Sequence, residues 1–132
     1  MDATEGTLMT GGYRFIEVER HGDVVVVTLK QRRLTEAEIN ILGDEVLRVG
    51  AEGSPRIVLN LQPSPEFLYS VFLAKLIALQ RQLTEIGGGL KLSGCDPKVV
   101  DVFEACQIKD RFQFFSDAES AVRSWTNENE ER

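Results

Sequence analysis

Residues 24–29 read VVVVTL, and this stretch decides the fold class. A run of β-branched residues without polar alternation is typical of a strand that is buried on both faces of a sheet. Residues 13–20 predict another strand just before it, and the turn residues at 21–23 join the two strands into a hairpin. Residues 56–61 read RIVLNL and predict a second core strand. The chain therefore has a sheet at its centre.

Two helices are expected, one before and one after the RIVLNL strand. In the first, residues 34–49, Thr35 and Glu38 have the spacing of a capping box. The second covers residues 68–86, and its apolar residues recur every three or four positions: Phe72, Leu76, Leu79, Leu83 and Ile86. Further apolar residues widen this stripe well past one face. A helix with so wide an apolar arc either lies at the centre of the fold or contacts a partner on its outer side.

The last part of the chain continues the alternation of strand and helix. It predicts strands at 90–93 and 112–115, and helices at 97–106 and 117–125. Each helix follows a capping residue: Asp96 for the first, and Ser116 or Asp117 for the second. The order of elements predicts an α/β fold with a mixed sheet of four to five strands, parallel after the opening hairpin, and about four helices.

Length and charge restrict the organisation and the partners. The 132 residues suit one domain, and we expect it over residues 13–125, with a flexible arm at 1–12 and a charged tail at 126–132. The chain has 15 Lys and Arg against 21 Asp and Glu, so its net charge of −6 disfavours binding to nucleic acid. No apolar run approaches the roughly 20 residues of a membrane span, and no signal-peptide pattern is visible. A cytoplasmic location is expected.

No catalytic constellation is visible in the sequence. The glycines at 87–89 lack the lysine and hydroxyl residue of a phosphate loop, and the single histidine, His21, disfavours most Ser-His and Cys-His arrangements. No residues have metal-ligand spacing, so we expect neither a metal nor another cofactor. The two cysteines, Cys95 and Cys106, are expected to be reduced and buried. These features favour a binding protein over an enzyme.

The junction between the RIVLNL strand and the following helix is the most informative place for function. The start of a helix presents free N–H groups and the positive end of the helix dipole. Tyr69 and Ser70 fall at this start. Two interpretations stay open here. One is an ordinary helix start with solvated side chains; the other is a protein-contact surface led by Tyr69, because tyrosine is common among interface anchors.

The succession of these segments resembles the STAS domain, the family of the anti-sigma factor antagonists and of the cytoplasmic tails of sulfate transporters. The resemblance covers about residues 13–125 and rests on IVLNL, LKLSGCDP, VFEACQI and DRFQFF in this order. It implies a bacterial, non-catalytic signalling domain that regulates transcription by binding an anti-sigma factor, a kinase-like regulator or other STAS subunits. Two alternatives are a domain that senses a nucleotide or lipid and a structural subunit of a larger signalling assembly. The oligomeric state stays open.

The resemblance also places a phosphorylation motif on this chain. In the antagonists, the strand is followed by six residues and then by Asp-Ser-Ser/Thr-Gly-Leu, whose first serine is phosphorylated by a partner kinase. The corresponding residues here are Leu68, Tyr69, Ser70, Val71 and Phe72. Tyr69 takes the place of the acceptor, and Ser70 follows it. We therefore expect no serine phosphoswitch of the usual kind, and a partner-binding surface made of Ser64, Glu66, Leu68, Tyr69, Ser70 and Val71.

Overall fold

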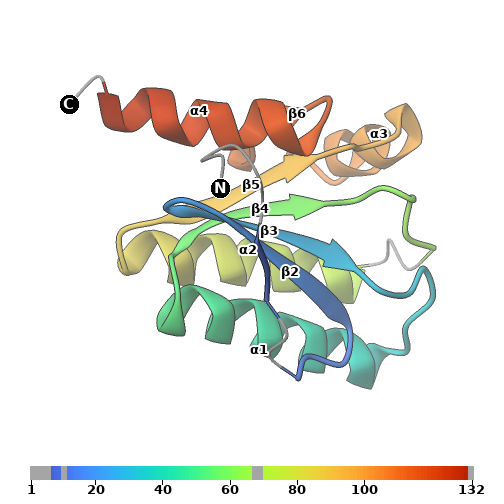
Figure 1. Ribbon diagram of the computed structural model, residues 1–132. Helices are drawn as coiled ribbons and strands as arrows, with labels where there is room; N and C mark the ends of the chain where they lie inside the picture. The colour runs from blue at the N-terminus through green and yellow to red at the C-terminus, as the bar shows by residue number, and fades with distance from the viewer. Residues whose placement is uncertain (1–6, 10–11, 67–69, 131–132) are drawn as a thin grey trace.

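The computed structural model describes residues 7–9, 12–66 and 70–130, which form a six-stranded sheet with helices on both faces (Figure 1). The strands follow one another in chain order across the sheet. They are β1 Thr7–Met9, β2 Ile16–His21, β3 Val24–Leu29, β4 Arg56–Asn60, β5 Gly89–Ser93 and β6 Phe114–Phe115. The first three pair antiparallel, and β3 to β6 pair parallel. The predicted mixed α/β sheet is confirmed.

Strand β1 corrects one expectation. The sequence predicts a flexible arm over residues 1–12, but Thr7–Met9 pairs antiparallel with residues 18–20 of β2. Without β1, strand β2 would be the edge of the sheet and would leave a row of backbone N–H and C=O groups unpaired. Backbone pairing of this kind needs no hydrophobic pattern, so the sequence gives no sign of it. The sheet gains one strand beyond the four to five expected.

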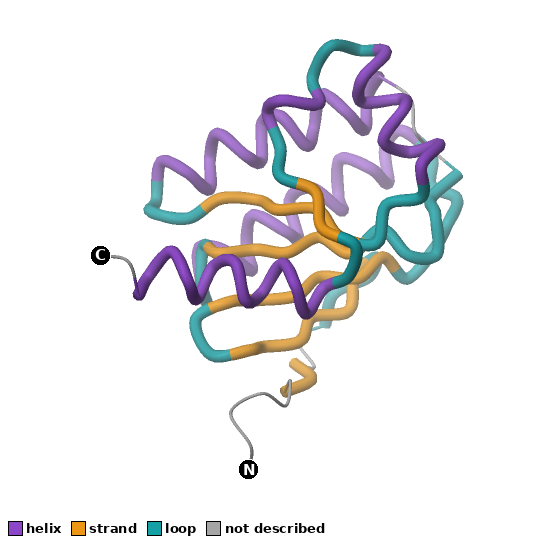
Figure 2. The backbone as a smooth tube through the Cα atoms, turned by 90° about the horizontal axis from the view of Figure 1, so that it is seen from above, coloured by secondary structure: helices purple, strands orange, loops and turns teal. Residues whose placement is uncertain are grey.

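The described residues hold four α-helices and one 3-10 helix: α1 Glu36–Glu52, α2 Ser70–Glu85, α3 Pro97–Ala105, η1 Lys109–Arg111 and α4 Ala118–Glu130. Helices α1 and α2 lie side by side on one face of the sheet, and α4 crosses the opposite face (Figures 1 and 2). Two bounds differ from expectation. The expected strand at 112–115 is shortened because η1 precedes it, and α4 continues through Glu130, into the segment expected to be a tail.

Capping side chains set the helix starts as the sequence predicts. The Thr35 hydroxyl accepts the N–H of Glu38 at 3.2 Å, and the Glu38 carboxylate accepts the N–H of Thr35 at 2.9 Å, so the capping box is confirmed. The Asp96 carboxylate accepts the N–H of the residue two positions later at 2.9 Å. Of the two caps expected for α4, Asp117 is used, because its carboxylate accepts the N–H of Ser120 at 2.7 Å.

The VVVVTL strand is buried on both faces because two cores meet at the sheet. Val25 and Val27 belong to the main core, which lies between the sheet and the pair α1 and α2. Val24 and Val26 belong to a smaller core under α4. The main core includes the residues expected there, each fully buried: Phe72, Leu76, Leu83 and Phe103.

Two side chains expected inside the protein lie at its surface. Ile86 is 50% exposed, because α2 ends one residue earlier and the chain then turns away. Cys106 is exposed, at the end of α3, whereas Cys95 is half-buried; both are free thiols. Burial raises the pKa of the Cys95 thiol to about 11, so this thiol is protonated at neutral pH.

Candidate functional site

The loops that follow β3 and β4 lie next to each other, because these strands are parallel neighbours and end at the same edge of the sheet. We call residues 30–34 the arginine loop, after its two arginines, and residues 61–66 the proline loop, after its two prolines. The Gln62–Pro63 peptide bond in the proline loop is cis. The carboxyl edge of a parallel sheet is where α/β folds commonly present their binding residues. The expected partner surface belongs to this edge.

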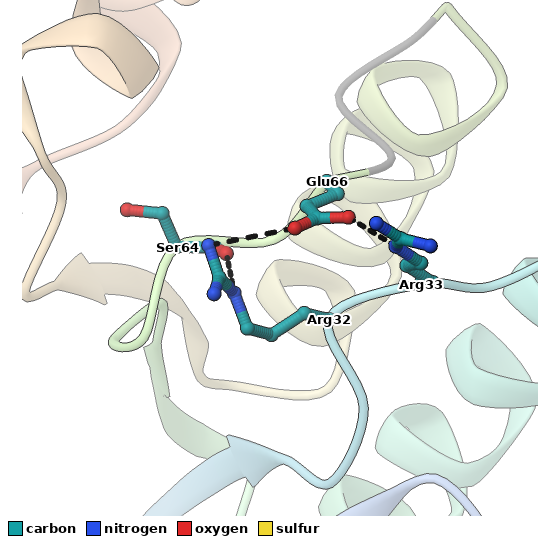
Figure 3. Close-up of polar contacts among 4 residues, drawn as sticks. All are labelled: Arg32, Arg33, Ser64 and Glu66. Carbon is teal, nitrogen blue, oxygen red and sulfur yellow. Dashed lines mark hydrogen bonds and ion pairs between the residues drawn. The ribbon is translucent and has the colours of Figure 1, made fainter.

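Polar contacts tie the two loops together (Figure 3). The N–H of Glu66 donates to the carbonyl oxygen of Arg32 at 2.6 Å, and Arg32 Nε donates to the carbonyl oxygen of Ser64 at 2.8 Å. The Glu66 carboxylate accepts a hydrogen bond from Arg33 Nε and lies 3.7 Å from Arg32 Nη2. Ser64 and Glu66, two of the predicted partner residues, are therefore joined through the arginine loop.

The Glu66 carboxylate lies between two guanidinium groups. The hydrogen bond and charge of Arg33, with a smaller effect of Arg32, hold the pKa of Glu66 below its ordinary value of 4.5. The three side chains stay open to solvent, with 86% of Arg33, 53% of Arg32 and 38% of Glu66 exposed. Ion pairs at such exposure contribute little to stability. These three side chains therefore determine the shape and charge of this surface and add little to the stability of the fold.

The proline loop is anchored to the sheet behind it. Leu61 is fully buried, and its N–H donates to the carbonyl oxygen of Ser93 at 2.9 Å. Gly94, directly after β5, has a φ of +67°, and a Cβ at this position would lie 2.6 Å from Asn60 Oδ1 and 3.0 Å from Gln62 Cβ. The backbone conformation favours glycine here, and a side chain at this position would also force the side chains of Asn60 and Gln62 to shift. The turn after β5 thus packs closely against Gln62 of the proline loop.

The structure places four of the six predicted partner residues. Glu66 is exposed and Ser64 is half-buried. Ser70 is exposed as the first residue of α2, and Val71 is half-buried against the main core. Two predicted residues lie outside the described part of the chain: Leu68 and Tyr69. Among the described residues, no hydrogen bond joins Ser70 to Ser64 or Glu66.

Sequence reasoning missed Arg32 and Arg33. The available signal is a basic pair directly after the VVVVTL strand, because carboxyl ends of parallel strands meet at one edge. However, Glu66 lies 33 residues from Arg33, so no local spacing connects the two side chains. Their pairing depends on the order of strands in the sheet.

The two loops are joined by hydrogen bonds and present exposed charged side chains, an arrangement suited to binding. Across residues 7–9, 12–66 and 70–130, no three His, Cys, Asp or Glu side chains gather into a group that could hold a metal ion. The same residues include no helix that is long and apolar enough to cross a membrane.

The model of the STAS domain family matches residues 15–121. The chain belongs to the STAS domain family. The matched part of this STAS domain begins just before β2 and ends within α4, so it includes both loops and the start of α2. A search of curated proteins gave no match.

Solved STAS structures share the fold at low sequence identity. An anti-sigma-factor antagonist (STAS) domain protein from Planctomyces limnophilus has a TM-score of 0.71 and 22% identity, over 83% of this chain and 96% of that one. The NMR structure of TM1081 from Thermotoga maritima has a TM-score of 0.73 and 16% identity, over 87% and 91%. Unphosphorylated SpoIIAA, an anti-sigma factor antagonist of Bacillus, has a TM-score of 0.69 and 18% identity, over 85% and 96%. At these identities the likeness shows the fold.

Proposed function

We propose that this STAS domain is a non-catalytic protein-binding module of cytoplasmic signalling that acts as an anti-sigma factor antagonist does. Its partner is an anti-sigma factor or a related kinase-like regulator. The partner docks on the arginine loop, the proline loop and the start of α2. The observation that carries this proposal is the tie through Glu66, which holds two exposed arginines in place beside the proline loop. Preorganised loops lose less conformational entropy on binding than free ones.

The proposal includes the loss of the usual serine phosphoswitch. Tyr69 occupies the position of the acceptor serine, and a phenol carries its hydroxyl several ångströms farther from the backbone than a serine does. Ser70 is exposed at the first position of α2, one residue after the acceptor position of the family. Phosphoryl transfer needs the attacking oxygen to be placed to within about 1 Å. We therefore expect the shift of one residue in the sequence to displace the Ser70 hydroxyl from the place of the family's acceptor.

Affinity purification with the full chain tests the partner. We expect it to recover a regulator with a kinase-like domain. Isothermal titration calorimetry then compares the parent with Glu66→Lys, which breaks the tie between the loops, and with Glu17→Lys, which makes the same charge change on an exposed position of β2. A loss of about tenfold in affinity for Glu66→Lys alone supports the proposal. Equal affinities for the two variants contradict it.

A second test addresses the start of α2. Tyr69→Ala should weaken the complex by about 1–3 kcal/mol without lowering the melting temperature, because interface tyrosines often act as anchors. Tyr69→Phe retains the ring and serves as the matched control. If the amide shifts caused by the partner map to α4 instead, the docking surface proposed here is wrong.

A groove beside α4 favours a second candidate function, the sensing of a small molecule. The groove has a volume of about 1000 Å³, and its lining includes Val26, Arg56, Asn60 and Val122. Ligand pockets commonly have volumes of about 300–1000 Å³ and combine apolar walls with a few polar groups. A thermal-shift screen with nucleotides and lipids tests this function. A ligand that stabilises the parent but not Arg56→Gln would support it.

A further inference from the structure

The outer face of α2 carries an apolar stripe, Ala74, Ile77 and Ala78, that the main core covers only in part, through Ile77. The residues facing the sheet are buried, and they are Phe72, Leu76, Leu79 and Leu83. On the opposite side of the helix Ala74 is exposed, and Ile77 and Ala78 are half-buried. The wide apolar arc expected from the sequence thus has a fully buried side and a side that stays partly open to solvent.

A groove follows this stripe. It has a volume of about 470 Å³ and lies between α2 and residues 111–112, and the apolar residues that line it are Ala74, Ile77, Ala78 and Phe112. Gln80 braces the groove, because its side chain donates to the carbonyl oxygen of Arg111 at 3.2 Å and accepts the N–H of Leu90 at 2.6 Å. The groove therefore has a fixed wall connected to β5.

Arg81 and Arg111 line the same groove. Both are exposed, and within the described part of the chain neither guanidinium group has a hydrogen bond or an ion pair. Other arginines are paired, among them Arg33 with Glu66. Two unpaired guanidinium groups beside an apolar groove, on a chain with a net charge of −6, are complementary to carboxylates on an apolar segment.

We propose that the stripe and groove bind an acidic amphipathic helix of the partner protein. The apolar face of that helix packs on Ala74, Ile77 and Ala78, and its carboxylates pair with Arg81 and Arg111. This inference rests on the proposed function, because it continues the same partner contact along α2. From Ser70 to Arg81 the helix rises about 16 Å, the length of about three turns. Recognition of an amphipathic helix by an apolar groove is a common mode of binding.

Continuity favours a protein segment over a small ligand. On a helix with 100° per residue, Ser70, Ala74, Ala78 and Arg81 lie on one side. The stripe therefore leads from the loop-and-helix surface proposed for the partner straight to the groove. The opposite end of that surface also carries exposed arginines, Arg32 and Arg33, which share the single carboxylate of Glu66 and so leave one net positive charge there. One partner with acidic groups at both ends of an apolar segment satisfies the whole surface.

Site-specific photo-crosslinking in the native host tests the inference. The crosslinker p-benzoylphenylalanine replaces Ser70, Ala78 or, as a control on α4, Glu119, one position at a time in the full chain. We expect Ser70 and Ala78 to cross-link the same partner and Glu119 to give none. The peptide cross-linked at Ala78, sequenced by mass spectrometry, should combine helical apolar spacing with Asp or Glu. If only Ser70 cross-links the partner, this inference is wrong but the proposed function stands. If neither position cross-links a partner, both the inference and the proposed function are wrong.

Charge reversal provides an independent measurement. Arg81→Glu combined with Arg111→Glu should weaken binding of the recovered partner by about tenfold or more, with a strong dependence on salt. The control combines Arg20→Glu with Lys98→Glu, two exposed positions elsewhere, for the same change in net charge. Equal affinities of the two double variants overturn the inference. Three other results would also overturn it. They are a cross-link from Ala78 to a second copy of this chain, a cross-linked peptide rich in lysine, and a small carboxylate bound at Arg81 in place of a protein.

Discussion

The backbone N–H of Glu66 donates to the carbonyl oxygen of Arg32 over 2.6 Å, so the two loops meet main chain to main chain. This bond is independent of the side chain at position 66. The ion pairs with Arg32 and Arg33, in contrast, need the carboxylate. Substitutions of Glu66 therefore separate the contribution of charge from the contribution of backbone geometry.

The pH dependence of stability is expected to change in Glu66→Gln. Arg33 and Arg32 hold the pKa of Glu66 below 4.5, so the ion pairs stabilise the folded state above that pH, and this contribution is lost as the pH falls through the lowered pKa. Glu66→Gln has no such contribution to lose. Because these ion pairs are exposed, the gap in melting temperature between parent and variant should be small. It should be present at about pH 7 and close as the pH falls below 4.5 through the lowered pKa. Thermal melts measure it, with Glu17→Gln as the charge-matched control; a gap that stays constant would contradict the assignment.

Gly94→Ala is expected to destabilise the protein by about 2–4 kcal/mol, because it combines an unfavourable backbone conformation with a steric clash. The new Cβ would meet Asn60 Oδ1 at 2.6 Å, behind the proline loop. Gly22→Ala is the matched control, since Gly22 has a similar φ of +63° but nothing within 4 Å of its Cβ position. It should cost only about 1–2 kcal/mol. Urea unfolding measures both, and equal costs would show that the side chains of Asn60 and Gln62 move aside freely.

Val58→Asp should cost several kcal/mol, roughly 4 or more, because it buries a carboxylate without a partner. Val58 is fully buried at the centre of the sheet, in the smaller core with Trp125 under α4. Val58→Ala, which leaves only a small cavity, is the comparison and should cost much less. Chemical denaturation at neutral pH measures the difference. A variant that melts within a degree or two of the parent would contradict the position of β4 in the core.

Patterns that reflect burial could be predicted from the sequence. The VVVVTL run is uniformly apolar because a core covers each face of β3, and the inner stripe of α2 repeats at the helical period. The caps Thr35 and Asp96 act within three residues of their own position. Strand β1 could not be predicted, because backbone pairing leaves no hydrophobic pattern. The link from Arg33 to Glu66 could not be predicted either, since it requires β3 and β4 to be neighbours. Polar contacts between residues far apart in the sequence depend on which strands are neighbours in the sheet, and the pattern of residues within one strand or helix does not specify this.

The last prediction concerns phosphorylation at the start of α2. Incubation with the cognate kinase and ATP should leave the intact mass of this STAS domain unchanged. Ser70 is an exposed hydroxyl at the first position of α2, but in the sequence it stands one residue after the acceptor position of the family. Val71 also adds bulk where the family has glycine, and Leu68 stands where the family has an acidic residue.

A variant with the family motif provides the positive control for this experiment. The triple substitution Leu68→Asp, Tyr69→Ser and Val71→Gly restores the acceptor and its neighbours, and it should gain one phosphate under the same conditions. Its phosphate should map to residue 69 by fragmentation of the digested protein. If the parent itself gains one phosphate on Ser70, and Ser70→Ala abolishes the gain, then the kinase tolerates the shifted hydroxyl, and this domain is switched by phosphorylation after all.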